Sequence, residues 1–153
     1  MSIFDFVKDA GEKLFGKNEK EQQALDDAAR GSALKQYVTK LQLPVKDLVV
    51  HFDGGTATVY GNAENQADKE KVILAVGNAQ GVARVDDRIT VAAPQPPAAF
   101  YTVRSGDMLS EIAKEHYGDA MMYATIFEAN RPMLSDPDKI YPGQVLRIPP
   151  KQA

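Results

Sequence analysis

Apolar residues recur at helical spacing in two stretches of the N-terminal part of this chain. Over residues 25–41 they stand three or four positions apart, which predicts an amphipathic helix that ends before Pro44. A second pattern of this kind covers residues 65–76 and stops at Gly77. We therefore expect two helices that each bury one face.

Runs of β-branched and aromatic residues fill the intervals between and after these helices. Residues 48–52 and 56–60 are two such runs, and Asp53-Gly54-Gly55 between them is a strong hairpin signal. Residues 83–91 form a third run. The order helix, strand, strand, helix, strand predicts an α+β unit in which two helices cover one face of a small mixed sheet.

The first 16 residues carry an apolar stripe of their own, formed by Ile3, Phe6, Val7, Ala10 and Leu14. This stripe predicts an N-terminal amphipathic helix over residues 1–16 that packs on the rest of the protein. Acidic and basic side chains interrupt the apolar positions, so the segment matches neither a secretory signal nor a membrane anchor. We expect a cytoplasmic protein without membrane insertion.

A proline-rich stretch over residues 93–99 cannot continue a helix or a sheet, and it favours an extended linker. Beyond it, strand-like runs at residues 100–103 and 145–148 enclose two helical stretches. The first of these helices is expected to begin at Asp107, which is a good N-cap residue. The second unit is therefore predicted to be β-α-α-β over residues 100–149.

The composition removes several functional classes. The 153 residues hold 18 basic and 21 acidic side chains for a net charge of −3, and no basic cluster stands out, so we expect no nucleic-acid partner. No cysteine is present, which excludes disulfides, thiolate metal ligands and cysteine nucleophiles. The two histidines, His51 and His116, lie far apart in the sequence, which argues against a zinc enzyme.

Two other groups of residues have the chemical types of an active site or an ion site. Ser105, Asp107 and His116 are the residue types of a catalytic triad, but His116 falls at the far end of the helix that Asp107 begins. We therefore expect no enzyme. Asp86 and Asp87 form an adjacent acidic pair. Successive strand residues point to opposite faces, so we do not expect this pair to bind a divalent cation.

The second unit contains a dense series of short motifs. They are YTVRSGDML at residues 101–109, IA at 112–113, YG at 117–118, IF at 126–127, Asn130, IYPGQVL at 140–146 and IP at 148–149. Together they resemble a LysM domain over residues 100–149. The resemblance implies a shallow groove for N-acetylglucosamine polymers, with Gly106, Asp107, Met108, Leu109, Ile140, Tyr141 and Pro142 at the matching positions.

The first unit carries a looser set of marks, namely Asp53-Gly54-Gly55 entering a strand, Gly61, Gly81-Val82 and Val85-Asp86-Asp87. These marks resemble a BON domain over residues 22–92. The order of an N-terminal FDFVKDAGEKL segment, one BON unit, a proline-rich linker and one LysM unit resembles the small cytoplasmic potassium-binding proteins of bacteria. This resemblance covers essentially the whole chain and implies selective K⁺ binding, with compaction of the two domains as the ion binds.

The same resemblance implies the ligands, which are the backbone carbonyls of Val7, Ala10, Glu12, Gly77, Ala79 and Val82. Neutral oxygens suit a large monovalent cation, and the last carbonyls of a helix lack intrahelical partners at the negative end of its dipole. Ala79 and Val82 stand where the family pattern has larger aliphatic residues, which affects affinity more than the existence of a site. Without the resemblance, the glycines near residues 11 and 77 are two ordinary helix C-caps.

These observations predict a monomeric, non-enzymatic K⁺ sensor or buffer of the cytoplasm, with K⁺ as its bound ion. The alternative is a peptidoglycan-binding adaptor of the cell envelope that acts through LysM. The lack of a secretory signal pattern favours the first function. A cytoplasmic chain does not meet assembled peptidoglycan, so we expect the LysM unit to clamp the BON unit rather than to bind glycan.

Overall fold

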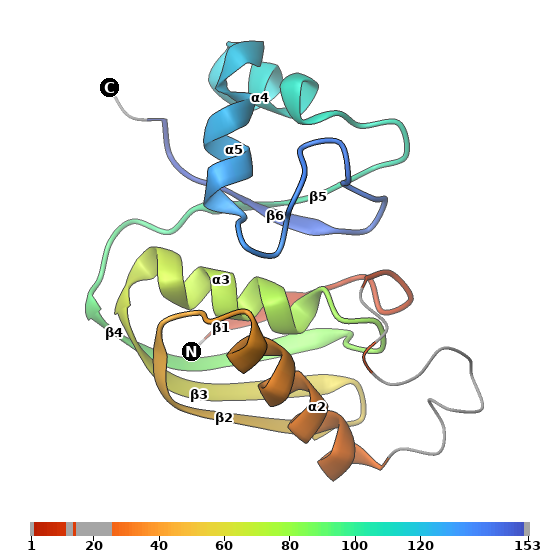
Figure 1. The fold of residues 1–153 in the computed structure, drawn as a ribbon, viewed down its shortest axis with the longest axis vertical. Helices are drawn as coiled ribbons and strands as arrows, with labels where there is room; N and C mark the ends of the chain where they lie inside the picture. The colour runs from red at the N-terminus through yellow and green to blue at the C-terminus, as the bar shows by residue number, and fades with distance from the viewer. Residues whose placement is uncertain (1, 12–13, 15–25, 152–153) are drawn as a thin grey trace.

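The computed structural model describes residues 2–11, 14 and 26–151, which form two units stacked along the long axis of the molecule (Figure 1). The first unit contains β1 (Ser2–Asp5), α2 (Asp27–Lys40), β2 (Val45–Asp53), β3 (Thr56–Asn65), α3 (Gln66–Gly77) and β4 (Arg84–Ala93). The second contains β5 (Ala99–Thr102), α4 (Leu109–Tyr117), a 3-10 turn η1 (Ala120–Met122), α5 (Tyr123–Ala129) and β6 (Val145–Ile148).

Local side chains explain where the elements of the first unit begin and turn. The carboxylate of Asp26 accepts a backbone N–H from the first turn of α2 at 2.8 Å, and the amide oxygen of Asn65 does the same for α3 at 2.9 Å. The hairpin between β2 and β3 turns at Gly54 and Gly55, whose φ angles of +56° and +90° favour glycine. The predicted hairpin and both helices are therefore present.

The four strands form a mixed sheet in the order β1-β4-β3-β2. Strands β3 and β4 are parallel and are joined by α3, whereas the other two pairs are antiparallel. Val59 and Val85 point to the face that packs on α2 and α3, while Tyr60 on the opposite face is 45% exposed. A mixed sheet with helices on one face confirms the predicted α+β class.

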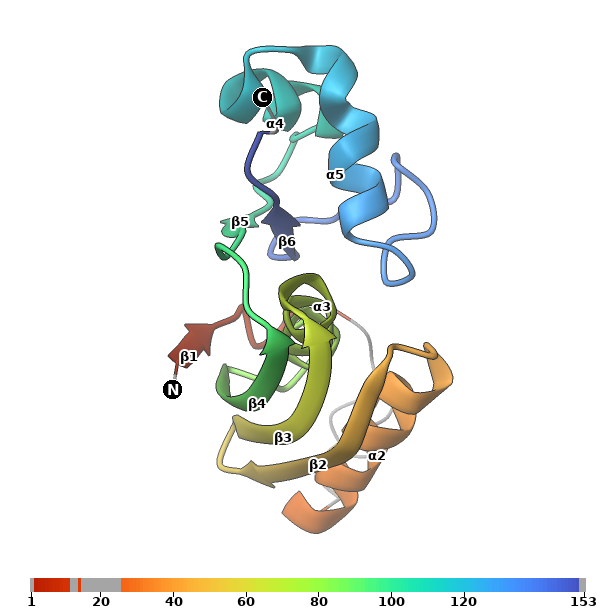
Figure 2. The ribbon, with the colours of Figure 1, turned by 90° about the vertical axis from the view of Figure 1, so that its left-hand side faces the viewer.

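The predicted N-terminal helix is wrong over residues 2–11. Ser2–Asp5 form strand β1 along the edge of β4, and residues 6–11 form turns (Figure 2). The open edge of β4 offers unpaired backbone groups to an added strand. Phe4 and Phe6 then pack on the core, whereas Ile3 is 65% exposed. Residues 1, 12, 13 and 15–25, which include most of the rest of that predicted helix, lie outside the described residues.

The second unit has its own core beneath α4 and α5. Its strands β5 and β6 pair antiparallel, and Ile112, Ile126 and Leu146 are fully buried between them and the helices. Asp107 is not the N-cap of α4, because Met108 holds that position without a side-chain hydrogen bond. The carboxylate of Asp107 is engaged elsewhere, since it accepts the Tyr101 hydroxyl at 2.5 Å.

The antiparallel pair of β5 and β6 lies over α3, so that helix separates the sheet of the first unit from the second unit (Figures 1 and 2). The C-terminal end of α3 therefore faces three segments: the N-terminal turn, the α3–β4 loop and the loop before β6. No helix within the described ranges is long and apolar enough to cross a membrane.

Candidate functional site

The N-terminal turn, residues 6–11, lies along the α3–β4 loop, residues 78–83. Three hydrogen bonds join the two segments: Phe6 N donates to Ala83 O at 3.0 Å, Gly81 N donates to Lys8 O at 2.6 Å, and Gln80 Nε2 donates to Asp9 O at 3.2 Å. Segments that are far apart in the sequence thereby form one site lined by backbone at the end of α3.

Two glycines allow this close approach. A Cβ on Gly11 would lie 1.6 Å from the carbonyl oxygen of Asn78, and the φ angle of Gly11 is +102°. A Cβ on Gly77 would lie 2.1 Å from the ring of Phe6, which packs directly on the end of α3. The close contact between the segments therefore requires glycine at both positions. Gly77 ends helix α3, whereas Gly11 does not follow a helix.

Five of the six predicted ligands lie in this site. Val7 and Ala10 belong to the N-terminal turn, Gly77 ends α3, and Ala79 and Val82 belong to the α3–β4 loop; Glu12 lies outside the described residues. The carbonyl oxygens of Val7 and Ala79 each accept one turn hydrogen bond of 3.2 Å. From the described part of the chain, no hydrogen bond reaches the carbonyls of Ala10, Gly77 or Val82.

This arrangement presents neutral oxygen atoms without a formal negative charge. The carbonyls lie where the dipole of α3 has its negative end, which favours a cation. Carboxylates are the usual ligands of Ca²⁺ and Mg²⁺, and within the described ranges no group of three or more Asp, Glu or His side chains is placed to hold a metal ion. The chemistry of the donor set therefore fits a weakly hydrated monovalent cation.

The second unit contacts the same site through Val145 and Gly143. Asn78 Nδ2 donates to the carbonyl of Val145 at 2.8 Å, and the Val145 N–H donates to Asn78 Oδ1 at 2.9 Å. A Cβ on Gly143 would lie 2.8 Å from the Cβ of Ala10 and 3.3 Å from that of Val7. The sequence gives no signal for these contacts, because an asparagine after a helix is usually only a C-cap.

Comparison with known proteins identifies both units. A LysM domain model matches residues 101–149, and a BON domain model matches residues 26–93. The potassium binding protein Kbp of Escherichia coli O6:H1 is 49% identical over 154 aligned residues, which span 97% of this chain and 99% of that protein. The chain belongs to the Kbp family. An uncharacterized protein of Deinococcus radiodurans is 55% identical over 49 residues, or 32% of this chain and 19% of that protein.

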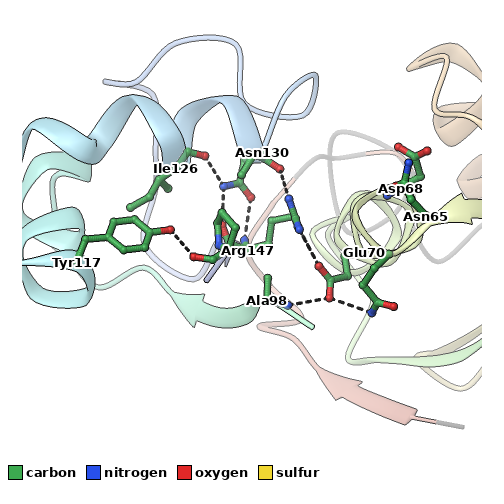
Figure 3. Close-up of polar contacts among 11 residues, drawn as sticks. Asn65, Asp68, Glu70, Ala98, Tyr117, Ile126, Asn130 and Arg147 are labelled. Atoms are coloured by element: carbon green, nitrogen blue, oxygen red, sulfur yellow. Dashed lines mark hydrogen bonds and ion pairs between the residues drawn. The ribbon is translucent and has the colours of Figure 1, made fainter. Parts of the chain in front are cut away.

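In this member of the Kbp family the BON and LysM units share a buried ion pair. Nε and Nη2 of Arg147 on β6 lie 3.0 and 2.9 Å from Oε1 of Glu70 on α3, and the two side chains are 9% and 3% exposed. Figure 3 shows Arg147 between Asn130 of the LysM unit and Glu70. The other Glu70 oxygen accepts the N–H of Ala98 at 3.0 Å, so this carboxylate also holds the linker.

Charged groups near the interface show the cost of burial. Burial, and secondarily the nearby Arg147 guanidinium, lowers the pKa of Lys71 below its usual 10.5. The rings of Phe4 of β1 and Phe100 of β5 are in contact, with centroids 5.0 Å apart and planes tilted by 34°, which adds an apolar contact between the units of this Kbp-family chain.

The acidic pair on β4 is divided between the two faces of the sheet, as predicted. Asp87 is buried and forms an ion pair of 2.8 Å with Lys69 of α3. Asp86 pairs with Arg88 at 3.0 Å, and the hydrogen bond from Arg88 lowers the pKa of Asp86 below 3.8. Each carboxylate thus has its own cationic partner.

The predicted glycan residues of the LysM unit are only partly brought together. Asp107, Met108, Leu109 and Ile140 line a groove of about 320 Å³, together with Tyr123 and Pro137. Tyr141 lines a different cavity of about 220 Å³ between the two units, with Asn78 and Gln144. Gly106 and Pro142 line neither of these hollows.

Proposed function

We propose that this chain binds K⁺ selectively through the backbone carbonyls of Val7, Ala10, Glu12, Gly77, Ala79 and Val82. The observation that carries the proposal is the backbone-lined site at the end of α3, where the carbonyls of Ala10, Gly77 and Val82 accept no hydrogen bond from the described residues. The relative with 49% identity, which is named a potassium binding protein, supports the same ion.

Selectivity follows from the neutral donor set. K⁺ loses its water readily and is satisfied by carbonyl dipoles alone. Na⁺ requires shorter bonds, so the N-terminal turn and the α3–β4 loop would have to close further, and Gly11 already lies against Asn78. Divalent cations require formal negative charge to compensate for their dehydration, and backbone carbonyls do not supply it.

The proposal includes a compaction of the two domains as the ion binds. K⁺ would hold the N-terminal turn against the α3–β4 loop. The LysM unit contacts both segments, since Gly143 lies against the N-terminal turn and Val145 is hydrogen-bonded to Asn78 of the loop. Ordering the site therefore also orders the surface on which LysM docks. In this arrangement LysM acts as a clamp on the BON unit.

We assign the chain the role of a monomeric K⁺ sensor or buffer without catalytic activity. A cytoplasmic location is part of this proposal. The acidic net charge of −3 and the absence of a basic cluster in the sequence argue against a nucleic-acid partner.

The test is thermal denaturation in KCl, NaCl and CaCl₂ at matched ionic strength. A ligand that binds only the folded state at a hundredfold excess over Kd stabilises it by about 2.7 kcal/mol. For a chain of this length that corresponds to a rise in Tm of about 5–10 °C in KCl. Small-angle scattering of the same samples should give a smaller radius in KCl than in NaCl. Equal Tm values in KCl and NaCl would contradict the proposal, because they indicate screening rather than a site.

A specific observation keeps the peptidoglycan function as the second candidate. The groove lined by Asp107, Met108, Leu109 and Ile140 shares no residue with the contacts of Asn78, Gly143 or Arg147. Docking of LysM on the BON unit therefore leaves that groove open. Pelleting of the purified protein with peptidoglycan separates this function from K⁺ binding.

A further inference from the structure

A buried side-chain oxygen in the α3–β4 loop has no hydrogen-bond partner among the described residues. This atom is Oε1 of Gln80, and its neighbours in the loop, Ala79 and Val82, are fully buried. Burying an amide oxygen without a partner disfavours the folded state, so native proteins rarely retain one. A bound water or ion is the usual explanation of such an atom.

The N-terminal turn sets the orientation of the Gln80 amide. Nε2 donates to the carbonyl of Asp9 at 3.2 Å, so turning the amide around would bring two oxygen atoms together. Oε1 must therefore point away from Asp9. Since Asp9 precedes Ala10 and follows Val7 by two positions, the amide is anchored on the turn that carries two proposed ligands.

The chemistry of this oxygen matches that of the backbone donors. A side-chain carboxamide and a peptide carbonyl are both neutral oxygen ligands, so Gln80 adds a donor without adding charge. A buried water needs two to four polar partners and can donate only two hydrogens. Among the described residues, Gln80 Oε1 and the carbonyls of Ala10, Gly77 and Val82 lack a hydrogen-bond partner, and all four groups are acceptors. One cation can satisfy several acceptors at once.

We infer that Gln80 Oε1 is an additional, side-chain ligand of the bound K⁺, beside the six backbone carbonyls. This inference rests on the proposed function. A side-chain ligand differs from the backbone donors in one respect: a substitution can remove or change it without altering the main chain.

The experiment compares Gln80→Met, Gln80→Glu and the intact chain by calorimetric titration with K⁺, Na⁺ and Ca²⁺. Gln80→Met keeps the length of the side chain and removes the oxygen, so K⁺ affinity should fall at least about tenfold. Gln80→Glu places a charged oxygen at the same position, so Ca²⁺ affinity should rise at least about tenfold. Gln95→Met, in the exposed linker, is the matched control and should titrate like the intact chain.

A second readout does not depend on affinity. The side-chain amide resonances of Gln80, assigned by their loss in Gln80→Met, should shift when K⁺ replaces Na⁺ at constant ionic strength. If Gln80 only supports Asp9, Gln80→Glu should lower the K⁺ affinity as Gln80→Met does, and it should not raise the Ca²⁺ affinity. That result would overturn the inference. Unchanged K⁺ affinity in Gln80→Met, or a static amide resonance, would indicate a buried water and would also overturn it.

The intact chain distinguishes the two proposals. If it shows no preference for K⁺ over Na⁺, the proposed function and the inference fail together. If it prefers K⁺ and Gln80→Met binds K⁺ equally well, the inference fails and the backbone site remains.

Discussion

The buried ion pair between the two domains allows a quantitative test of the clamp. Arg147 donates to one oxygen of Glu70 through two nitrogens, at 3.0 and 2.9 Å, and both side chains are almost fully buried. In Arg147→Met the aliphatic part of the side chain is kept, but the Glu70 carboxylate loses its cationic partner. We expect this change to separate the LysM unit from α3.

The magnitude follows from the burial of the pair. Removing one partner of a buried ion pair costs about 3–5 kcal/mol, because the other charge is left without compensation. The partners here lie on different domains, so undocking returns Glu70 to water and limits the observed cost to the free energy of docking. A change of about 3 kcal/mol reduces the docking equilibrium constant about a hundredfold.

The radius measured by scattering and the K⁺ affinity measured by titration should therefore both change in Arg147→Met. We expect a larger radius in KCl than that of the intact chain, and a weaker apparent K⁺ affinity because the proposed function couples docking to ion binding. Arg131→Met is the matched control, since the Arg131–Glu128 pair is largely exposed and contributes less than about 1 kcal/mol. The double variant Glu70→Met/Arg147→Met should recover part of the loss, because an apolar pair leaves no buried charge. An Arg147→Met protein with the radius and K⁺ affinity of the intact chain would refute the reasoning.

Three further predictions concern the backbone site and the LysM unit. Gly11→Ala should abolish K⁺-dependent stabilisation in melting experiments, since its Cβ would lie 1.6 Å from the carbonyl oxygen of Asn78, whereas Gly118→Ala (φ +77°, open space) should lose stability from backbone strain but keep K⁺ binding. The hydrogen bond from the Tyr101 hydroxyl holds the pKa of Asp107 below its usual 3.8 in the folded state. The ionised Asp107 carboxylate therefore stabilises the fold fully at pH values above 3.8, and this contribution is lost as the pH falls through the lower pKa of the folded state. Asp107→Asn should flatten this acid limb in urea denaturation between about pH 2 and 5. Finally, the protein should not pellet with peptidoglycan at physiological salt, and saturable pelleting that a Met108→Ala change abolishes would favour the envelope function.

Elements with strong local signals could be predicted from the sequence. The hairpin at Asp53-Gly54-Gly55 and the helix ended by Gly77 are set by turn residues whose conformational preferences act locally. The N-terminal strand could not be predicted in this way. Ile3, Phe6 and the residues after them also satisfy helical periodicity, and the strand that recruits them, β4, lies at the other end of the unit. Tertiary pairing overrides the local pattern here.

The candidate site was predictable only in part, for a related reason. A site built from backbone carbonyls leaves no pattern of side chains, so its glycines are visible in the sequence but their contacts are not. The contact of Gly11 with Asn78 and the buried oxygen of Gln80 appear only when the two segments lie together. The ligand roles of all six residues stay predictions.

Strand β1 has a consequence for the order in which the protein opens. Ser2 pairs with Asp87, so forming this part of the sheet brings together the two ends of a long chain segment. Closing so long a loop has an entropic cost that disfavours the pairing. Edge elements of this kind form the least stable cooperative unit of a domain. The strand continues directly into the turn that holds Val7 and Ala10, so fraying of β1 should open the proposed ion site before the remaining sheet unfolds. Amide hydrogen exchange at residues 3–5 should therefore slow as K⁺ saturates the protein. Exchange at the amides of β3 starts from a lower rate because it requires global unfolding, and it should slow as well, since that opening also releases the ion.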